Sequence, residues 1–413
     1  MLNPNSKLKQ TDKEKMRTWV ELDRNAIAHN FKLFNSIVDN KKTIVMPVVK
    51  SNAYGHGLVP FTKEVVKLGA KFLGVDSFEE ALELRANGIK TRILVFGYTS
   101  PAYFKEASEK NISVTISSMN SLLAISKIKF TSPLTPLLVN ERGNKLKIHI
   151  KVDTGLGRQG FPVEELGNVL NILENYKKTR STSSGQVEVE GLYTHLAVGE
   201  ALSGKAYTMM QAGKLDTWYQ AFKEEGYKPL RHICATSSTM FFPELHYDMV
   251  RIGIGSYGLW PSRETKQAMQ KKYKLMPVLS WKTIITEIKE IKKGSKIGYD
   301  LTEELKKDSE LGIIPIGYWH GYPRALSGKG LFSVLSHKAK LVGRVSMDMI
   351  VLDLTKIGAK IGDEVAIIGG SKMDTKGNIV GHYAEADMMA QDADTINYEI
   401  VTRINPIIKR FIG

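Results

Sequence analysis

The chain has 413 residues, of which 42% are hydrophobic, 24% charged and 8% aromatic. This composition excludes a largely disordered chain, and the length favours two domains, although one barrel domain can take up about 250 residues. The formal net charge of +15 is spread among interspersed acids. It therefore indicates solvated surface, and on its own it is weak support for a nucleic-acid-binding protein.

The single cysteine, Cys234, excludes an intrachain disulfide and a cysteine-built zinc site. Residues 1–18 are polar and charged, which predicts an N-terminal tail rather than a signal peptide. No later stretch approaches the roughly 18 uninterrupted apolar residues of a membrane span. We expect a cytoplasmic protein with no membrane partner, no nucleic-acid partner and no metal.

Residues 43–255 alternate short β-branched runs with amphipathic stretches, a pattern typical of parallel strands joined by helices. Eight runs follow it: Thr43–Lys50, Phe72–Ser77, Arg92–Gly97, Ser113–Ser117, Lys147–Asp153, Glu188–His195, Leu230–Thr236 and Asp248–Gly255. Helices are predicted between them, for example over Phe78–Ala86 and Tyr207–Glu225. Eight such units match the size of a TIM barrel. The alternative is a doubly wound open sheet.

After about residue 271 the pattern changes to strands without regular helices between them. The runs are LSWKTIITEIKEI (279–291), LGIIPIGY (311–318), FSVLS (332–336), KLVGRVSMDMIVLDL (340–354) and EVAIIGG (364–370). A helical segment follows over residues 383–404, and residues 130–145 read as an inserted surface loop. We expect an α/β protein with a TIM-like (β/α)8 barrel over residues 19–270 and a mainly-β domain over residues 271–413. The first strand of the chain can pair with the β domain.

The segment VVKSNAYGHG (48–57) ends an apolar strand on a lysine and continues into a glycine-punctuated turn. Burial of Lys50 at a barrel mouth would disfavour its ammonium form, lower its pKa and free the amine for Schiff-base formation. The ordinary alternative is a lysine that reaches solvent at a strand end. Other polar residues also fall near strand ends, namely Asp153, His195, Thr236 and Arg251. Catalytic groups of TIM barrels gather at that end of the strands.

The ten residues 48–57 resemble the pyridoxal-phosphate lysine motif of bacterial alanine racemases, a fold-type III family. Further segments resemble the same family in chain order: KVDTGLGRQGF (151–161), GLYTHLA (191–197), CATSS (234–238), DMVRIGIGSYGLWPS (248–262), GYD (298–300), GRVSMDM (343–349) and TINYE (395–399). The similarity covers nearly every residue from Trp19 onward. It implies pyridoxal 5'-phosphate as cofactor and a head-to-tail homodimer whose active sites draw on both subunits.

The resemblance implies racemisation of alanine by two bases, which would supply D-alanine for peptidoglycan. Lys50 would hold the cofactor and serve as the base on one face of the substrate Cα, and Tyr299 from the partner's β domain would serve on the other. Two bases are needed because one residue beside a planar carbanion reaches only one face. Lysine and tyrosine titrate near pH 10 when free, so both pKa values must be lowered, by burial in the case of the lysine or by nearby positive charge.

The resemblance also implies the groups that hold the cofactor. Arg251 would donate to the pyridine nitrogen without giving up its proton, and His195 would support Arg251 or the ring. The phosphate would be bound by neutral donors, namely Tyr54, Ser237, the backbone of Gly253 and Ile254, and Tyr398. Each of these residue types is common in turns or cores, so the assignment depends on the surrounding match.

Substrate binding is implied for Arg158, whose planar fork matches a carboxylate, with help from the backbone N–H of Met347 of the partner. Asp348 and Tyr318 would line the partner side of the site. Lys151 corresponds to a lysine that is carbamylated in many family members.

Some positions differ from the usual pattern of the family, namely Gly298, Asp300, Ser346, Trp319, His320 and Thr236. None removes a catalytic group, and a small change in a pocket wall discriminates between substrates by only about 1–3 kcal/mol. A serine or broad-specificity racemase therefore stays open as an alternative. A pyridoxal-phosphate carrier protein is a second alternative, but such carriers resemble the barrel alone and lack the β domain.

Overall fold

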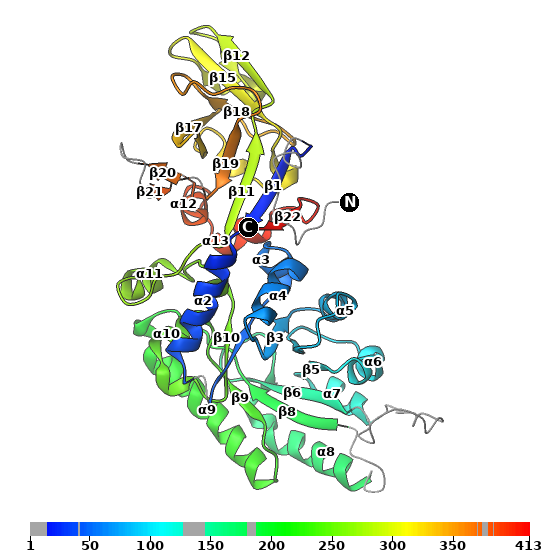
Figure 1. Cartoon of the computed structure of the whole chain (residues 1–413). Helices are drawn as coiled ribbons and strands as arrows, with labels where there is room; N and C mark the ends of the chain where they lie inside the picture. Colours follow the sequence, from blue (N-terminus) through cyan, green and yellow to red (C-terminus); the bar gives the residue numbers. More distant parts are fainter. Residues whose placement is uncertain are drawn as a thin grey trace.

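The computed structural model describes residues 15–39, 42–126, 145–179, 187–369, 371–373, 379–382 and 384–413. The loop predicted over residues 130–145, except Lys145, and the predicted N-terminal tail, except residues 15–18, lie outside the described residues. Figure 1 shows two parts: parallel strands surrounded by helices, and a sheet-rich domain that stands on them. Within the described ranges, no helix is long and apolar enough to cross a membrane.

The first part is a nearly closed barrel of parallel strands (Figure 1). Its strands are β2 (Ile44–Pro47), β3 (Phe72–Val75), β4 (Arg92–Val95), β5 (Ile112–Ile116), β6 (Leu146–Asp153), β8 (Val187–Tyr193), β9 (Leu230–His232) and β10 (Met249–Ile252). The sheet runs in the order β2-β10-β9-β8-β6-β5-β4-β3, and a parallel bridge between Val48 and Gly74 brings its two ends together. The predicted barrel is thus confirmed, and the open-sheet alternative is wrong.

Continuous apolar runs explain these strands, because a barrel strand is covered on both faces. Every residue of β3, β5 and β10 is buried. The helices of this part are α2 (Arg24–Ile37), α3 (Lys50–Tyr54), α4 (Leu58–Lys67), α5 (Phe78–Ala86), α6 (Phe104–Glu109), α7 (Met119–Ile125), α8 (Leu166–Thr179), α9 (Lys205–Glu224), α10 (Thr236–Phe241) and α11 (Arg263–Met269). A capping box between Ser77 and Glu80 fixes the start of α5, which spans the predicted range Phe78–Ala86.

The second part is built on a sheet in the order β12-β15-β18-β17-β16-β19-β11-β1-β22. Its strands are β1 (Thr18–Leu22), β11 (Leu279–Ile284), β12 (Glu287–Ile291), β15 (Ser309–Ile314), β16 (Leu331–Val334), β17 (His337–Val342), β18 (Ile350–Asp353), β19 (Glu364–Ile368) and β22 (Arg410–Ile412). Two further pairs lie outside this sheet: β13 (Lys296–Ile297) with β14 (Glu303–Glu304), and β20 (Ser371–Met373) with β21 (Ile379–His382). Strand β1 pairs antiparallel with β11 and parallel with β22, so the start of the chain belongs to the C-terminal sheet.

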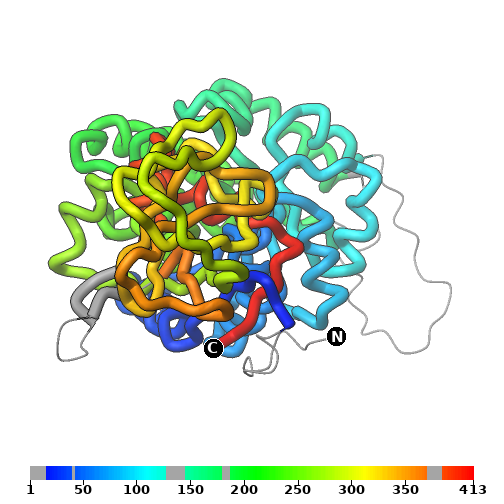
Figure 2. Tube along the Cα trace, turned by 90° about the horizontal axis from the view of Figure 1, so that it is seen from above, coloured from blue at the N-terminus to red at the C-terminus, as the bar shows by residue number. Residues whose placement is uncertain are grey.

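Two runs that the sequence presents as continuous are divided in the structure. Residues 279–291 form β11 and β12, and residues 340–354 form β17 and β18 with a loop over residues 343–349 between them. The C-terminal helical segment likewise splits into α12 (Ala386–Asp392) and α13 (Asn397–Thr402). In Figure 2 the last residues, in red, run beside the first strand, in blue, where the two parts of the molecule meet.

Candidate active site

A strained turn at the carboxyl end of β2 presents Lys50 to the barrel mouth. Ser51, Asn52, Ala53 and Tyr54 all have φ between 50° and 56°, a left-handed conformation that costs a non-glycine residue roughly 1–2 kcal/mol. The carboxylate of Glu80 offsets this cost, since its Oε1 accepts hydrogen bonds from the amides of Ser51 (2.5 Å) and Asn52 (3.3 Å). Backbone strain of this kind is concentrated at functional sites.

Lys50 itself pairs with an acid inside the mouth. Its Nζ lies 3.0 Å from Oδ1 of Asp76, and 36% of its side chain is exposed in the single chain. Full burial, which the sequence suggests for this lysine, is therefore not found within one subunit. The ion pair places the amine at the wall of a cavity of about 1400 Å³ that opens at this end of the barrel.

The turn also makes a close contact with the C-terminal domain. Gly55 has φ +79°, and a Cβ atom there would lie 1.8 Å from the carbonyl oxygen of Val401 in α13. Only glycine allows this approach. Buried Arg410 fixes it further, because its Nε and Nη2 donate to the carbonyl of Gly55 at 3.1 and 3.0 Å. Helix α13 thus reaches the cavity from the other domain.

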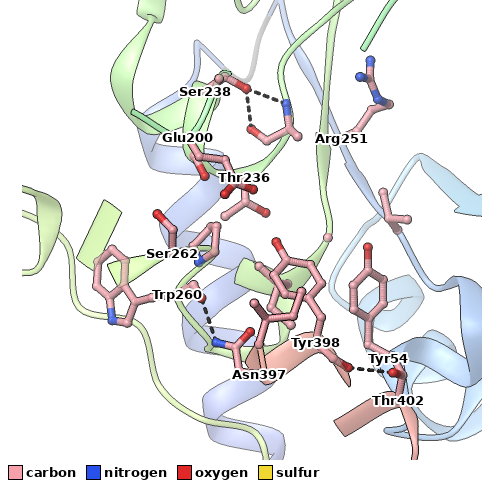
Figure 3. A pocket seen from close by; sticks show the side chains of 18 of the residues that line it. Tyr54, Glu200, Thr236, Ser238, Arg251, Trp260, Ser262, Asn397, Tyr398 and Thr402 are labelled. Carbon is pink, nitrogen blue, oxygen red and sulfur yellow. Dashed lines mark hydrogen bonds between the residues drawn. The ribbon is translucent and has the colours of Figure 1, made fainter. Parts of the chain in front are cut away.

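The turn and α13 bring two tyrosines together at one end of the cavity. The rings of Tyr54 and Tyr398 are 5.9 Å apart, and Figure 3 shows both hydroxyls pointing into the cavity. Burial raises the pKa of each phenol, so both remain protonated donors. Gly253 lies close to Tyr54, since a Cβ atom at this glycine would lie 2.7 Å from the Tyr54 hydroxyl.

Backbone amides from two strand ends face the same region. Ser237 stands in the first turn of α10 after β9, while Gly253 and Ile254 follow β10. Within the described part of the chain, the amides of these three residues donate no hydrogen bond to protein. Unpaired amides and hydroxyls that converge in this way are suited to a phosphate. This end of the cavity therefore fits the phosphate of a cofactor such as pyridoxal phosphate.

Arg251 supplies the cation deeper in the cavity (Figure 3). Its Nη1 donates to Nδ1 of His232 at 2.9 Å, and its Nη2 donates to the carbonyls of Thr194 and Ile233 at 3.0 and 2.9 Å and approaches Nδ1 of His195 at 3.2 Å. Among the described residues its Nε–H has no acceptor, which fits an acceptor such as a pyridine nitrogen.

Charge and burial set the protonation states around this arginine. Burial lowers the pKa of Arg251 to about 10, so the guanidinium stays charged near neutral pH. Burial and the charge of Arg251 lower the pKa of His195 to about 3, so this histidine is neutral. Arg251 therefore donates a hydrogen bond without giving up its proton, and His195 beside it carries no acidic proton. Neither residue could protonate a cofactor nitrogen.

The loop after β6 brings Arg158 to the cavity. The Asp153 carboxylate accepts hydrogen bonds from four amides of this loop, those of Gly155, Leu156, Gly157 and Arg158. Partial burial acts to raise the pKa of Asp153, but these bonds outweigh it and lower the pKa. The loop therefore has one fixed shape, and it places a guanidinium suited to a carboxylate at the cavity wall.

Lys151 lies buried beside this loop. Its Nζ donates to Oε1 of Gln159 at 2.9 Å, and Nε2 of Gln159 is fixed in turn by Ser117 at 3.2 Å. Burial, followed by the charges of Arg158 and Arg251, lowers the pKa of Lys151 to about 8. Part of this amine is therefore neutral near physiological pH.

Four residues predicted at the site do not line the cavity of the single chain: Tyr299, Tyr318, Met347 and Asp348. They lie on loops of the C-terminal domain, where 69% of Tyr299 and 54% of Met347 are exposed. The loops of Tyr318 and Met347 are hydrogen-bonded to one another, since the amides of Tyr318 and Trp319 donate to the carbonyls of Ser346 and Met347. The other predicted residues all line the cavity: Lys50, Tyr54, Lys151, Arg158, His195, Ser237, Arg251, Gly253, Ile254 and Tyr398.

Two family models match this chain. The model of the alanine racemase N-terminal domain matches residues 22–261, and that of the alanine racemase C-terminal domain matches residues 278–412. The chain belongs to the alanine racemase family. Membership makes it an isomerase of the racemase class. The C-terminal match also separates this family member from carrier proteins that have the barrel alone.

Relatives of the same family match nearly the whole chain. Alanine racemases of Leptospira interrogans and Methanococcus maripaludis are each 36% identical to it, over 97% and 95% of this chain and 97% of each relative. Among solved structures, that of the Bacillus anthracis alanine racemase with bound L-Ala-P has a TM-score of 0.83 and 31% identity, covering 96% of this chain and 95% of that one. The alanine racemase of Streptomyces lavendulae has a TM-score of 0.82, also with 31% identity, over 96% of this chain and 97% of that one.

The structure adds residues that sequence reasoning missed in this family member. Asp76 pairs with Lys50, Gln159 holds Lys151, and His232 accepts from Arg251. Asp76 stands directly after β3, and that position at a strand end was a usable signal. His232 is fully buried at the end of β9, and nothing in its sequence context distinguishes it from a core residue.

Proposed function

We propose that this chain interconverts L-alanine and D-alanine with pyridoxal phosphate held in the barrel mouth, in the cytoplasm, where the D-alanine serves peptidoglycan synthesis. The observation that carries the proposal is the content of one cavity. A lysine stands at its wall, and a cluster of neutral phosphate donors lies at one end. An arginine whose Nε–H finds no acceptor among the described residues also lines it.

The residues present fit this cofactor. Tyr54, Tyr398 and the amides of Ser237, Gly253 and Ile254 would hold the phosphate, Lys50 would attach to the aldehyde carbon, and Arg251 would donate to the ring nitrogen. Pyridoxal phosphate, when bound, supplies the electron sink that makes the α-hydrogen of an amino acid removable as a proton. Because Arg251 keeps its proton, the ring nitrogen is left unprotonated, which limits side reactions such as transamination.

Inversion requires proton transfer on both faces of the substrate Cα. Lys50 serves one face, where Asp76 orients its amine at 3.0 Å. Tyr299 serves the other face and comes from a second copy of the chain, because within its own subunit it lies outside the cavity. The Tyr299 phenol then loses its exposure to solvent when the two copies meet, and the contact places it within reach of the substrate as a general acid–base group.

The substrate carboxylate is assigned to Arg158, assisted by the amide of Met347 from the second copy. Within the described residues this amide donates no hydrogen bond. Asp348 and Tyr318 of that copy complete the wall. Lys151 supports Arg158, and its partly neutral amine can react with carbon dioxide to form the carbamate that the family resemblance implies.

A second copy is also favoured by the exposed surface of the C-terminal domain. Large apolar side chains are exposed on the three loops that carry the partner-side residues: Tyr299, Leu301, Tyr318, Trp319, Met347 and Met349. An exposed apolar patch of this kind is typical of a protein–protein interface. A twofold contact would place the patch of each copy over the cavity of the other.

Mixing two inactive variants tests the shared site. Lys50→Ala and Tyr299→Phe are each expected to be inactive as homodimers. In a mixed dimer one of the two sites regains both wild-type residues, so co-refolding is expected to restore about a quarter of the wild-type rate by random pairing. Chiral chromatography of the alanine product measures the rate, and a panel with L-serine ranks the substrates. If mixing restores no activity while mixed dimers form, the tyrosine does not act across the subunits.

A further inference from the structure

A line of buried polar side chains crosses the interior of the barrel, from Arg251 near the carboxyl ends of the strands to Glu190. Nη1 of Arg251 lies 2.9 Å from Nδ1 of His232, whose Nε2 lies 3.0 Å from Nδ1 of His149. Nε2 of His149 lies 3.0 Å from Oε2 of Glu190. At the far end Glu190 accepts from Arg92 at 2.6 Å, at the start of β4, and from the hydroxyl of Ser113.

The two ends of this line allow only one direction for its hydrogen bonds. An arginine can only donate, and an ionised carboxylate can only accept. His232 must therefore accept at Nδ1 and carry its proton on Nε2, and His149 must do the same. A second proton on either ring would force a proton of His232 toward the guanidinium. Both histidines are thus neutral Nε2–H tautomers, and the carboxylate determines this three hydrogen bonds away from Arg251.

The surroundings keep these groups in place. Both rings are fully buried, and the ring of His232 stacks on Tyr193 with centroids 4.5 Å apart and an angle of 8° between the planes. His149 packs against the backbone at Gly191, where a Cβ atom would lie 2.0 Å from its Nδ1. Burial alone would raise the pKa of Glu190, but the hydrogen bond from His149, the charge of Arg92 and the hydrogen bond from Ser113 hold it well below its usual range.

We propose that Glu190 is a positioning residue for the cofactor ring: through His149 and His232 it holds Arg251 in the one orientation that leaves its Nε–H free for the pyridine nitrogen. The inference rests on the proposed function, since it assumes pyridoxal phosphate in the cavity. It extends the cofactor machinery through the barrel to side chains that the cofactor never contacts. A change at one end of this line affects the other end, because reversing the tautomer of one histidine reverses every hydrogen bond in the line.

The substitution Glu190→Gln tests the direction of this line. An amide has one acceptor oxygen, and the cation of Arg92 takes it, which turns the –NH₂ group toward His149. His149 must then accept at Nε2 and carry its proton on Nδ1, and His232 must follow. The reversed His232 presents a proton to Arg251, so the guanidinium is expected to rotate away from its position in the wild type.

Nitrogen-15 NMR of histidine-labelled, cofactor-loaded protein reports the tautomers directly. The wild type is expected to show His149 and His232 as neutral Nε2–H forms, and Glu190→Gln is expected to show both as Nδ1–H forms. The variant is also expected to have a shifted cofactor absorbance and a kcat lowered roughly ten- to a hundredfold, with KM changed by less than about twofold, as for the loss of other outer positioning partners.

Glu64→Gln is the matched control, because Glu64 is also buried and pairs with two cations, Arg24 at 3.0 Å and Lys67 at 2.6 Å, but it lies outside this line. It is expected to leave the tautomers and the absorbance unchanged. A wild-type His232 protonated on Nδ1 would overturn the inference even if Glu190→Gln failed to fold. So would a folded variant with wild-type tautomers and spectrum. Wild-type protein that binds no pyridoxal phosphate would instead contradict the proposed function, and the tautomers of the line would remain measurable.

Discussion

The barrel mouth and the exposed loops of the C-terminal domain differ in how far their proposed functional side chains are buried. At the mouth, Arg251 and Lys151 are buried and held by hydrogen bonds to neighbours of the same chain, and Ser237 is buried too. On the loops, Tyr299 and Trp319 are 69% and 60% exposed. In the function we propose, one chain therefore contains nearly everything needed to bind the cofactor and only half of what is needed to invert a substrate. Cofactor binding and catalysis should depend differently on assembly.

The largest effects are expected from replacing the two proposed bases, Lys50 at the barrel mouth and Tyr299 on the exposed loops. Lys50→Ala removes the attachment point at the mouth, so the yellow absorbance of bound pyridoxal phosphate should disappear and racemisation should fall by at least about a thousandfold. Tyr299→Phe should keep the yellow absorbance while the rate falls by about 10² to 10⁴. Absorbance spectra and chiral assays measure both. Lys67→Ala serves as a surface-lysine control. A wild-type racemisation rate in Tyr299→Phe would contradict the role of Tyr299 as a base.

Separating the two subunits should likewise reduce racemisation without abolishing cofactor binding. Trp319→Asp places a charge in the exposed apolar patch and should yield single subunits, which sediment more slowly, keep the yellow absorbance and racemise more than about tenfold more slowly. Sedimentation velocity and rate measurements on the same sample test this. Ile361→Asp is the matched control, because Ile361 is also exposed and apolar but belongs to the loop between β18 and β19 rather than to one of these three loops. Full activity of separated Trp319→Asp subunits would contradict a shared site.

A smaller effect, on stability and cofactor affinity, is expected from a substitution at Gly55, where the lysine turn contacts α13. In Gly55→Ala the new methyl group meets the carbonyl of Val401, so α13 must shift and carry Tyr398 with it. We expect a loss of about 1–3 kcal/mol in unfolding free energy and weaker binding of pyridoxal phosphate. Gly88→Ala is the control, because Gly88 has a similar φ of +81° and nothing lies within 4 Å of the position that a Cβ atom would take there. Equal cofactor affinity in the two variants would mean that the contact is irrelevant to the site.

The smallest effect is a gain in stability at the mouth. The pKa of Lys151 falls from 10.5 in the unfolded chain to about 8 in the fold, so the folded state loses free energy by holding this ammonium below pH 8. Lys151→Met should therefore raise the unfolding free energy at pH 7 by about 1–2 kcal/mol while lowering activity. The gain should fade as the pH rises from about 8 to 10.5, because the unfolded wild type binds more protons there.

Urea titrations in buffer free of carbon dioxide measure this effect. Lys282→Met should show the opposite sign, since the hydrogen bonds from Lys282 to Glu21 and Glu364 outweigh its burial and raise its pKa. A loss of stability in Lys151→Met at pH 7 would show that Gln159 and the aromatic face of Tyr193 more than compensate the buried charge.

Much of this arrangement follows from the sequence. Continuous apolar runs predict all eight barrel strands, and the position of Lys50 after such a run predicts a lysine at the mouth. The identity of the cofactor-binding residues came from the family resemblance, since serine, glycine and tyrosine are too common in turns and cores to indicate a phosphate site alone. Their convergence on one cavity is a finding of the structure.

Other features could not be predicted because they depend on distant partners. The left-handed turn at Ser51–Tyr54 has no glycine among its four residues, and Glu80 from the next unit stabilises it. The run 340–354 reads as one strand because its apolar pattern is nearly unbroken, although a loop interrupts it over residues 343–349. Burial of Lys50 at the barrel mouth was expected, and in the single chain 36% of its side chain stays exposed.

The hydrogen bonds from Arg410 to the carbonyl of Gly55 join residues that are 355 positions apart in the sequence. Arg410 also donates to the carbonyls of Asn405 and Ile404, so the segment that precedes it is bound to the same side chain. During synthesis the lysine turn emerges from the ribosome long before these hydrogen bonds can form. The turn that carries Lys50 therefore gains its hydrogen bonds from Arg410 only once residue 410 has been made, and a nascent chain that stalls earlier has the barrel strands but lacks this contact.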